Sequence, residues 1–258
     1  TGFVDKNEDS LIVSDEDFAS IAVGEKRNRK RVLITDLLET HFVKGIFSAI
    51  ESRMNISMQN MLKKCNRVLI PDIGQDVDNI SYVGPVVRNL SITDWALLRK
   101  KLGIEKRTIL VSIGGTSAGR YLIERTLSAY KNLKMKTDLD LIVALGPSLS
   151  KFENNNTSYR NIGFVDNLHE YVCASDLVVS LAGRSTIDES LVYGTPGVFI
   201  PIKDHFEQEQ NAKKLGYSYD DISRLETLIE EKLELGRTNR ANVRNGAKNA
   251  AKIITELI

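Results

Sequence analysis

The sequence predicts an α/β fold built from two Rossmann-like, doubly wound domains, of which the first is incomplete. Short apolar runs rich in β-branched residues alternate along the chain with segments of helical periodicity, the pattern of buried parallel strands and their connecting helices. Glycine-rich turns follow several of these runs. The series is interrupted near residue 90, after the Gly84-Pro85 pair, so we assign residues 1–90 to one domain and residues 91–258 to a second.

Composition describes a soluble globular protein whose partners are not nucleic acids. The chain has 258 residues, 42% of them hydrophobic and 27% charged, which is enough for two ordinary domains. A net charge of +1 provides no positive field to attract a phosphate backbone. No apolar run approaches the roughly 20 residues of a membrane helix, and the N-terminus lacks a signal-peptide core. Because Cys65 and Cys173 lack metal-ligand spacing, we expect a protein of the reducing cytoplasm without a metal site.

The first domain alternates strands and helices. In chain order we expect a strand at 9–13, a helix at 18–24, strands at 31–35 and 67–70, and an extended segment at 80–87. Between residues 45 and 64 a long helix has an apolar face that we expect to pack on the core, formed by Phe47, Ile50, Met54, Met58 and Met61. Because a sheet should not start at Asp9, we expect the opening strands of this domain to be missing from the chain.

In the second domain the alternation of helices and strands begins again. In chain order we expect a helix at 95–102, a strand at 108–113, a helix carrying Leu122, Ile123, Leu127 and Tyr130, a strand at 139–145, a polar loop at 154–158, a strand at 162–165 and a helix at 168–174. Two more helical patterns, at 224–233 and 242–258, finish the chain. This alternation predicts a parallel sheet covered by helices on both faces.

Residues 176–212 form a strand–helix–strand unit with the outline of a nucleotide pocket. The unit consists of a strand at 177–179, a helix that begins at Gly183, Ser185 and Thr186 and ends at 194–196, and a strand at 198–200. The unpaired N–H groups at a helix start after a parallel strand suit a phosphate. Glu189, about one turn further along, can accept two hydrogen bonds from a ribose diol.

The same stretch resembles the donor-nucleotide half of the MurG-like glycosyltransferases, family 28 of the GT-B type. The resemblance rests on the series AGRSTIDE at 182–189, followed by Gly194, Pro196, Pro201, Gln208, Asn211 and Ala212. It implies that Glu189 holds the nucleotide ribose and that Gln208, with Glu207 beside it, contacts the donor sugar. It also implies a Gly-Pro linker at the domain boundary and a last helix that crosses back to the first domain.

Two further loops are candidates for contact with the donor. Gly114, Gly115, Thr116 and Ser117 lie between a strand and a helix, so they indicate a tight turn and a diphosphate cradle about equally. The resemblance favours the cradle, because the family has a Gly-Gly-Ser-rich loop in this place. It also implies that main-chain groups at Val165 contact a uracil edge, whereas the residues alone indicate only a strand end.

The charged residues of the 182–189 series have competing interpretations. Arg184 either neutralises a diphosphate or is an exposed surface arginine, and the sequence favours neither. Asp188 is expected to be solvated or to cap the helix, and the usual reason for an acid such as Glu189 near a helix start is the helix dipole.

The general base is the group that the sequence identifies least directly. Direct displacement at an anomeric carbon requires a group that takes the proton of the acceptor hydroxyl. Asp15, Glu16 and Asp17 follow the first strand, on the side of the cleft that the resemblance implies; Asp15 and Asp17 are our candidates, together with His205 in the loop after Pro201. A solvated acidic turn and a surface histidine are the alternatives. No metal or other cofactor is required, since helix-end amides can stabilise a departing diphosphate.

From the resemblance we expect an inverting glycosyltransferase that moves a sugar, with N-acetylglucosamine among the candidates, from a UDP-sugar to an unidentified acceptor. Hydrolysis or epimerisation of a UDP-sugar is the alternative on the same scaffold, and a donor-binding subunit that needs a partner chain is another. The preferred interpretation of the basic residues at 26–31 is an ordinary solvated surface. Their second interpretation is contact with a lipid-linked acceptor or with the inner face of a membrane.

Overall fold

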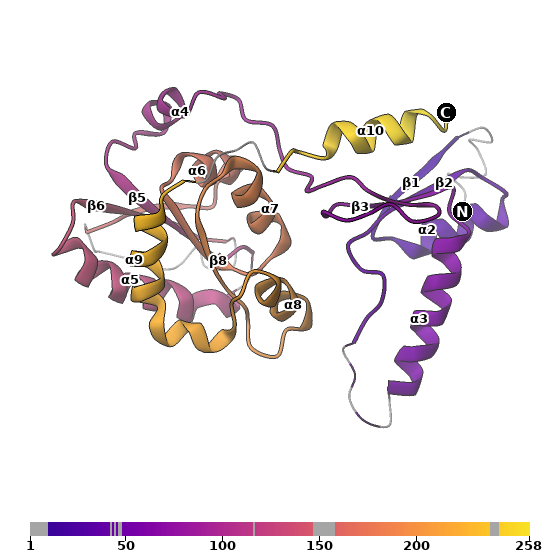
Figure 1. The fold of residues 1–258 in the computed structure, drawn as a ribbon, viewed down its shortest axis with the longest axis horizontal. Helices are drawn as coiled ribbons and strands as arrows, with labels where there is room; N and C mark the ends of the chain where they lie inside the picture. The colour runs from indigo at the N-terminus through magenta and orange to yellow at the C-terminus, as the bar shows by residue number, and fades with distance from the viewer. Residues whose placement is uncertain are drawn as a thin grey trace. The chain divides into compact units, whose positions relative to one another are not determined.

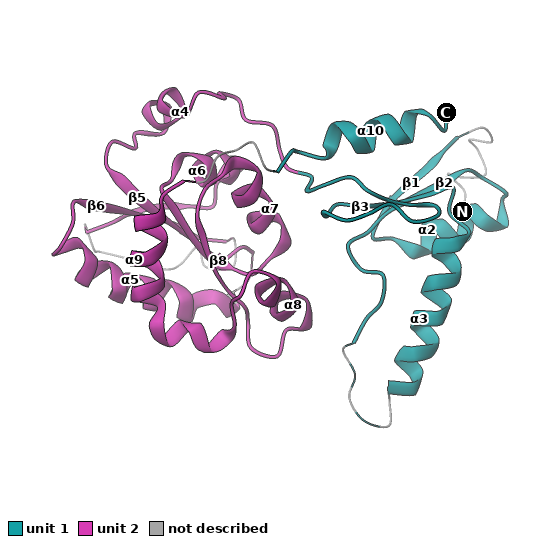
Figure 2. Ribbon diagram, viewed as in Figure 1, with its two compact units in different colours: residues 1–86, 243–258 teal, residues 87–242 magenta. Residues whose placement is uncertain are grey.

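The structure, a computed structural model, describes residues 10–41, 43, 45, 48–115, 117–146, 158–237 and 243–258. The chain divides into two compact units (Figure 2): unit 1 consists of residues 1–86 and 243–258, and unit 2 of residues 87–242. In both units the described residues form a parallel sheet. Residues 243–258 therefore group with the first unit and not with the 91–258 range assigned to the second domain.

In the described part of unit 1, the sheet has four parallel strands in the order β1-β2-β3-β4. The described helices and strands of unit 1 are β1 (Ile12–Asp15), α2 (Phe18–Lys26), β2 (Arg31–Ile34), α3 (Ser48–Lys63), β3 (Arg67–Ile70), β4 (Ile80–Tyr82) and α10 (Ala247–Thr255). Because successive side chains of a strand point to opposite faces, Leu33 and Val68 pack with α2 and α3 while Val32 and Leu69 pack with α10. Figure 1 labels these helices around the sheet. The last helix thus lies on unit 1, where the resemblance implies a returning helix.

Two predictions for unit 1 need correction. β1 begins at Ile12 and continues through Asp15, where we expected a strand at 9–13 followed by a turn. Only part of the apolar face of α3 meets the core: Met58 is buried, whereas Ile50 and Met54 are 66% and 49% exposed. The N-terminal half of α3 extends past the sheet (Figure 1), so these two side chains have no sheet beneath them. Phe47 lies outside the described residues.

In the described part of unit 2, the sheet has five parallel strands in the order β7-β6-β5-β8-β9. The strands are β5 (Arg107–Ser112), β6 (Leu139–Ala144), β7 (Arg160–Gly163), β8 (Leu177–Leu181) and β9 (Gly197–Ile200). The chain moves outward from β5 through β6 to β7 and then returns to the other side of β5 for β8 and β9. The order therefore reverses between β5 and β8, and open α/β sheets bind ligands at the carboxyl ends of strands beside such a reversal.

Helices cover both faces of this sheet. They are α4 (Trp95–Leu102), α5 (Arg120–Lys134), α6 (Leu168–Ala174), α7 (Arg184–Tyr193), α8 (Phe206–Lys214) and α9 (Leu225–Leu235). Ile109 and Val179 pack with α5 and α9 on one face, and Leu110 and Val178 pack with α4 and α6 on the other. The predicted α/β fold with parallel sheets is confirmed.

Several boundaries in unit 2 differ from the prediction. The strand expected at 162–165 is β7, which ends at Gly163, so Val165 lies in the connection to α6. The residues after Pro201 form a helix, α8, from Phe206 onward, where we expected a loop. Most of the polar loop at 154–158 lies outside the described residues. Within the part of the chain that the structure describes, no helix combines the length and the apolar character that crossing a membrane requires.

Candidate functional site

The carboxyl ends of the strands of unit 2 lie at one edge of the sheet, here called the carboxyl edge. Each strand leads there into a glycine or a proline, namely Gly114, Gly146, Gly163, Gly183 and Pro201. The short 3₁₀ helix η2 (Ser117–Gly119) and then α5 begin after the turn of β5, and α7 begins after the turn of β8. The N–H groups of these helix starts, which have no acceptor within their own helix, therefore lie at this edge.

A cavity of about 160 Å³ lies at the ends of β5, β6 and β7. Its lining is mostly apolar and consists of Ser112, Gly114, Gly115, Ala144, Leu145, Gly146, Gly163, Phe164, Val165 and Leu168. Gly114 has a left-handed backbone with φ of +66°, and a Cβ at Gly146 would lie 1.9 Å from the Gly114 carbonyl oxygen. Two backbone segments therefore touch directly, and only a glycine at position 146 permits this contact.

The cavity brings together Gly114, Gly115 and Val165, which the sequence analysis assigned to the same ligand. Phe164, which the sequence analysis did not single out, lines the same cavity and is 65% exposed, so its ring offers an uncovered apolar surface. Of the remaining residues of the glycine run, Thr116 lies outside the described residues and Ser117 is described only as the first residue of η2.

The turn between β8 and α7 leaves its backbone accessible. Gly183 is the N-cap of α7, and a side chain there would meet no atom within 4 Å. On the first turn of the helix, Ser185 is exposed and Thr186 is half-buried. Because the first N–H groups of a helix are unpaired and stand at the positive end of its dipole, this turn can bind an anion.

Arg184 and Asp188 form an ion pair within α7. The Arg184 Nε lies 2.9 Å from the Asp188 Oδ2, with 17% of the Arg184 side chain and 6% of the Asp188 side chain exposed. The expectation that Asp188 is solvated or caps the helix is therefore wrong, and Arg184 is not an exposed surface arginine. Contact of Arg184 with a diphosphate stays a prediction.

Glu189 is half-buried on α7, and none of the residues that the structure describes donates a hydrogen bond to its carboxylate. Burial raises the pKa of Glu189 to about 7, an effect that the positive charge of Arg88 opposes and the negative charge of Asp188 reinforces. A carboxylate that has lost part of its hydration in this way gains from any hydroxyl donors that a ligand brings.

Arg88 is a residue of this site that the sequence analysis missed. Its Nη1 donates to the Asp166 carbonyl oxygen at 2.7 Å, and its charge acts on both Glu189 and His169. Arg88 therefore links the segment after β7, which carries Val165, to the side of the edge that carries Glu189. A single arginine after a linker belongs to no periodic pattern, so only the fold reveals this position.

The start of α8 is fixed by polar side chains. Its N-cap is His205, whose Nδ1 accepts a hydrogen bond from the Gln208 backbone N–H at 3.4 Å. The Gln208 Oε1 accepts one from the Ile202 N–H at 3.1 Å, and Glu207 is half-buried beside it. Asn211 Nδ2 donates to a carbonyl oxygen of the turn between β8 and α7 at 3.3 Å. Gln208 thus holds the segment after β9, Asn211 holds the turn between β8 and α7, and His205 caps α8.

The acids at the end of β1 take part in the structure of unit 1. Asp17 is the N-cap of α2, and hydrogen bonds from a serine hydroxyl and from backbone N–H groups of the first turn hold its pKa below the ordinary value. Glu16 accepts hydrogen bonds from the Thr35 hydroxyl at 3.0 Å and from the Asp36 N–H at 2.8 Å. Asp15 is exposed at the end of β1. Capping of α2 explains the presence of an acid at position 17, and no catalytic role is needed.

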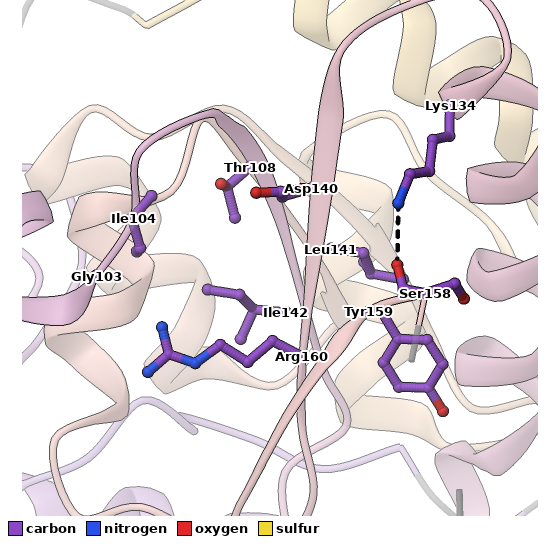
Figure 3. Close-up of a pocket in the computed structure, with 10 residues that line it drawn as sticks. All are labelled: Gly103, Ile104, Thr108, Lys134, Asp140, Leu141, Ile142, Ser158, Tyr159 and Arg160. Carbon is purple, nitrogen blue, oxygen red and sulfur yellow. Dashed lines mark hydrogen bonds between the residues drawn. The ribbon is translucent and has the colours of Figure 1, made fainter. Parts of the chain in front are cut away.

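Another cavity of unit 2, larger than the first, lies at the opposite edge of the sheet (Figure 3). It has a volume of about 280 Å³ at the amino ends of β5, β6 and β7, where Thr108, Asp140 and Arg160 line it. Lys134 Nζ donates to the Ser158 carbonyl oxygen at 3.2 Å in its wall. The accessible helix starts and glycine turns are at the carboxyl edge, so the smaller cavity is the candidate site.

The described residues do not group as metal ligands. No three His, Cys, Asp or Glu side chains among them are placed as a metal ion would need. The carboxyl edge offers a ligand backbone N–H groups and an apolar cavity, and Glu189 lies on the second turn of the helix that begins there.

Comparison with known proteins relates the chain to glycosyltransferases. The family model for the glycosyltransferase family 28 C-terminal domain matches residues 108–257. The UDP-N-acetylglucosamine--N-acetylmuramyl-(pentapeptide) pyrophosphoryl-undecaprenol N-acetylglucosamine transferase of Rickettsia bellii is 30% identical over 244 residues, which cover 81% of this chain and 68% of that protein. An uncharacterized glycosyltransferase of Methanopyrus kandleri is 24% identical over 216 residues, which cover 80% of this chain and 60% of that protein.

Solved structures with similar folds include a glycotransferase and a putative epimerase. The glycotransferase of kitacinnamycin has a TM-score of 0.64 at 15% identity, covering 98% of this chain and 77% of its own. A putative UDP-N-acetylglucosamine 2-epimerase from Listeria monocytogenes has a TM-score of 0.63 at 13% identity, covering 99% of this chain and 76% of its own. At these identities the likeness shows the fold alone, and it confirms the predicted GT-B class. The chain spans about three fifths of the length of the curated relatives that it matches first, 60% and 58%.

Proposed function

The chain belongs to glycosyltransferase family 28, and from this premise we propose that unit 2 binds a UDP-sugar at its carboxyl edge and that the protein transfers the sugar to an acceptor with inversion at the anomeric carbon. The observation that carries the proposal is the state of Glu189. Its carboxylate is half-buried, its pKa is raised to about 7 by burial, and it has no donor among the described residues. It lies on a helix whose start is open to a ligand.

Each part of a UDP-sugar has a counterpart at this edge. The two ribose hydroxyls can donate to the Glu189 carboxylate, and the diphosphate can accept from N–H groups at the start of α7 and at the glycine turn after β5. The uracil ring suits the apolar cavity that Val165 and Phe164 line. The sugar is then directed toward the turn after β9, where the amide nitrogen of Gln208 carries two hydrogens that can reach a sugar hydroxyl.

The proposed reaction is a single displacement. The acceptor oxygen attacks the anomeric carbon, the bond from that carbon to the β-phosphate oxygen breaks, UDP leaves, and a base takes the hydroxyl proton. Backbone N–H groups at the two helix starts stabilise the negative charge that develops on the departing diphosphate. We keep Asp15 as the candidate base, because Asp17 caps α2 and His205 caps α8.

We further propose N-acetylglucosamine as the sugar and a lipid-linked molecule as the acceptor, with the protein acting in the cytoplasm at the inner face of a membrane. The support is the name of the Rickettsia bellii relative, which states a UDP-N-acetylglucosamine donor and a pyrophosphoryl-undecaprenol acceptor. The glycosyltransferase of Methanopyrus kandleri is uncharacterized, so its name adds the reaction class and no substrate.

A thermal-shift experiment with a nucleotide panel tests the proposed donor. UDP and UDP-N-acetylglucosamine should raise the melting temperature, because a ligand that binds only the folded state stabilises it by mass action. ADP, GDP and CDP at the same concentration should raise it less. A chain that UDP does not stabilise, or that all these nucleotides stabilise equally, would contradict the proposal.

Product analysis separates transfer from the alternatives. With UDP-N-acetylglucosamine alone, a strict transferase should leave the donor nearly intact. Free sugar in the reaction would identify a hydrolase, and a changed sugar still linked to UDP would identify an epimerase. Activity that appears only when a second chain is added would identify a donor-binding subunit.

A further inference from the structure

The segment from Pro201 to His205, here called the sugar loop, is held as a closed turn. The His205 N–H donates to the Ile202 carbonyl oxygen at 3.2 Å. Side chains of α8 hold two of its N–H groups: Gln208 Oε1 accepts from Ile202 N at 3.1 Å, and Glu209 Oε1 accepts from Asp204 N at 2.9 Å. Asp204 has a φ of +62°, a conformation that residues other than glycine rarely adopt. These hydrogen bonds therefore stabilise a turn that the backbone alone would not favour.

A further anchor of the sugar loop comes from a different helix. Tyr121 lies on the first turn of α5, and its Oη donates to the Pro201 carbonyl oxygen at 2.9 Å. Burial raises the pKa of Tyr121 to about 12, so the hydroxyl keeps its proton at neutral pH. The Tyr121 ring packs on Tyr219 with 5.8 Å between centroids, and Lys203 Nζ, from the sugar loop, lies 5.9 Å from the Tyr219 ring centroid. The loop is thus attached to α5 by a hydrogen bond, and its Lys203 lies beside the ring that packs on Tyr121.

Tyr121 follows the glycine turn of β5 closely in the sequence, so its hydrogen bond connects that turn to the sugar loop. α5 begins directly after η2, which follows the Gly114–Gly115 turn of β5. Gln208 and Glu209 lie on α8, which follows the sugar loop, so their bonds set the shape of the loop and not its distance from β5. The Tyr121 hydroxyl joins residues 80 positions apart in the sequence and ties the sugar loop to the helix that follows the glycine turn of β5.

We propose that Tyr121 is a positioning residue that fixes the sugar loop relative to the glycine turn of β5 and thereby favours UDP-sugar over UDP. This inference rests on the proposed function, in which the glycine turn binds the diphosphate and the sugar loop with Gln208 contacts the sugar. A UDP-sugar that contacts both segments must match the spacing between them. UDP lacks the sugar and contacts only the first, so its affinity does not depend on this spacing.

Calorimetric titration with UDP and with UDP-N-acetylglucosamine tests the inference in the wild type, Tyr121→Phe and Tyr130→Phe. Tyr130 is the matched control because it lies on the same helix and its single hydroxyl hydrogen has two backbone acceptors within reach, the oxygens of Leu139 and Ser158 at 3.1 and 3.0 Å. Tyr121→Phe keeps the ring and removes one hydrogen bond, so it should weaken UDP-N-acetylglucosamine binding roughly 3- to 10-fold relative to UDP. Tyr130→Phe should lower the melting temperature and leave the ratio of the two Kd values unchanged.

The ratio of Kd values separates positioning from a purely structural role, because a loosened fold weakens both ligands equally. An unchanged ratio in Tyr121→Phe, or the same change in both variants, overturns the inference and leaves the proposed function in place. A wild-type chain that binds neither ligand overturns the proposed function and this inference with it.

Discussion

Both units carry acids near the carboxyl end of a parallel strand, and the hydrogen bonding of these acids differs. At the edge of unit 1, Asp17 caps α2, and Glu16 accepts hydrogen bonds from Thr35 and Asp36. At the edge of unit 2, Glu189 has no donor among the described residues, and glycine turns leave the backbone accessible. A polar group whose hydrogen bonds are made inside the protein supports the fold, whereas one with bonds still to be made can offer them to a ligand.

The largest effect should come from crowding the glycine contact at the edge of unit 2. A Cβ at Gly146 would lie 1.9 Å from the Gly114 carbonyl oxygen, so Gly146→Ala must push two backbone segments apart. We expect the free energy of unfolding to fall by about 3 kcal/mol and UDP binding to be lost. Denaturant unfolding and calorimetric titration measure the two effects.

Gly115→Ala is the control for this prediction. It changes a neighbouring turn of the same cavity, but a Cβ at Gly115 would meet no atom within 4 Å. The free energy of unfolding should therefore change by no more than about 0.5 kcal/mol. Equal stability losses in Gly146→Ala and Gly115→Ala would show that the direct backbone contact does not hold this edge together.

A smaller effect should appear in the pH dependence of donor binding. Burial raises the pKa of Glu189 to about 7, so its carboxyl group is largely protonated below that pH and ionised above it. If the ribose diol binds the ionised form, affinity for UDP-N-acetylglucosamine should fall up to about tenfold per pH unit below pH 7 and level off above it. Titrations across this range measure the dependence.

Glu189→Gln should remove this pH dependence, because an amide does not titrate. UDP-N-acetylglucosamine is the suitable ligand, since both of its phosphates are esterified and do not titrate near neutral pH. A wild-type affinity that stays flat from about pH 5 to about pH 8 would rule out Glu189 as the group that binds in its ionised form.

The smallest effect is expected from Asp17 in unit 1. Asp17→Ala removes the N-cap of α2, so it should lower the melting temperature slightly and leave the affinity for UDP unchanged. Hydrogen bonding, chiefly from the Ser20 hydroxyl, holds the pKa of Asp17 below the ordinary value. The cap therefore stabilises the fold at neutral pH, and this contribution is lost as the pH falls through the lowered pKa. Melting curves of wild type and variant should converge in acid, and a changed UDP affinity would contradict the contrast between the two edges.

Much of the fold could be predicted from local sequence. The run at 67–70 has the same bounds as β3, and the run at 177–179 lies inside β8, because buried parallel strands need short stretches of β-branched residues. The glycines at 114 and 183 mark strand-to-helix turns for an equally local reason. These turns meet at one edge because parallel strands end on the same side.

Other features depend on contacts that no local pattern contains. Helical periodicity places Ile50 and Met58 on one face of α3, but it cannot say how far the sheet beneath extends. The proximity of Arg88 to Glu189 arises from segments distant in sequence. The pairing of Arg184 with Asp188 is different, since a spacing of four residues on a helix could have indicated it.

Glu189 is the group proposed to bind the donor ribose, and removing its carboxylate should not harm the fold. Because burial raises the pKa of Glu189 above its ordinary value, the ionised side chain disfavours folding as the pH rises toward and beyond about 7. Glu189→Ala should therefore be at least as stable as the wild type near neutral pH. Glu230→Ala is a matched control, since Glu230 lies on α9 and pairs with Lys136 at 2.9 Å.

Calorimetric titration of UDP into wild type, Glu189→Ala and Glu230→Ala is the most direct test. We predict that Glu189→Ala weakens UDP binding at least about 100-fold, the size of two hydrogen bonds to a charged group, while Glu230→Ala binds as the wild type does. Equal affinity of Glu189→Ala and wild type for UDP would contradict the account.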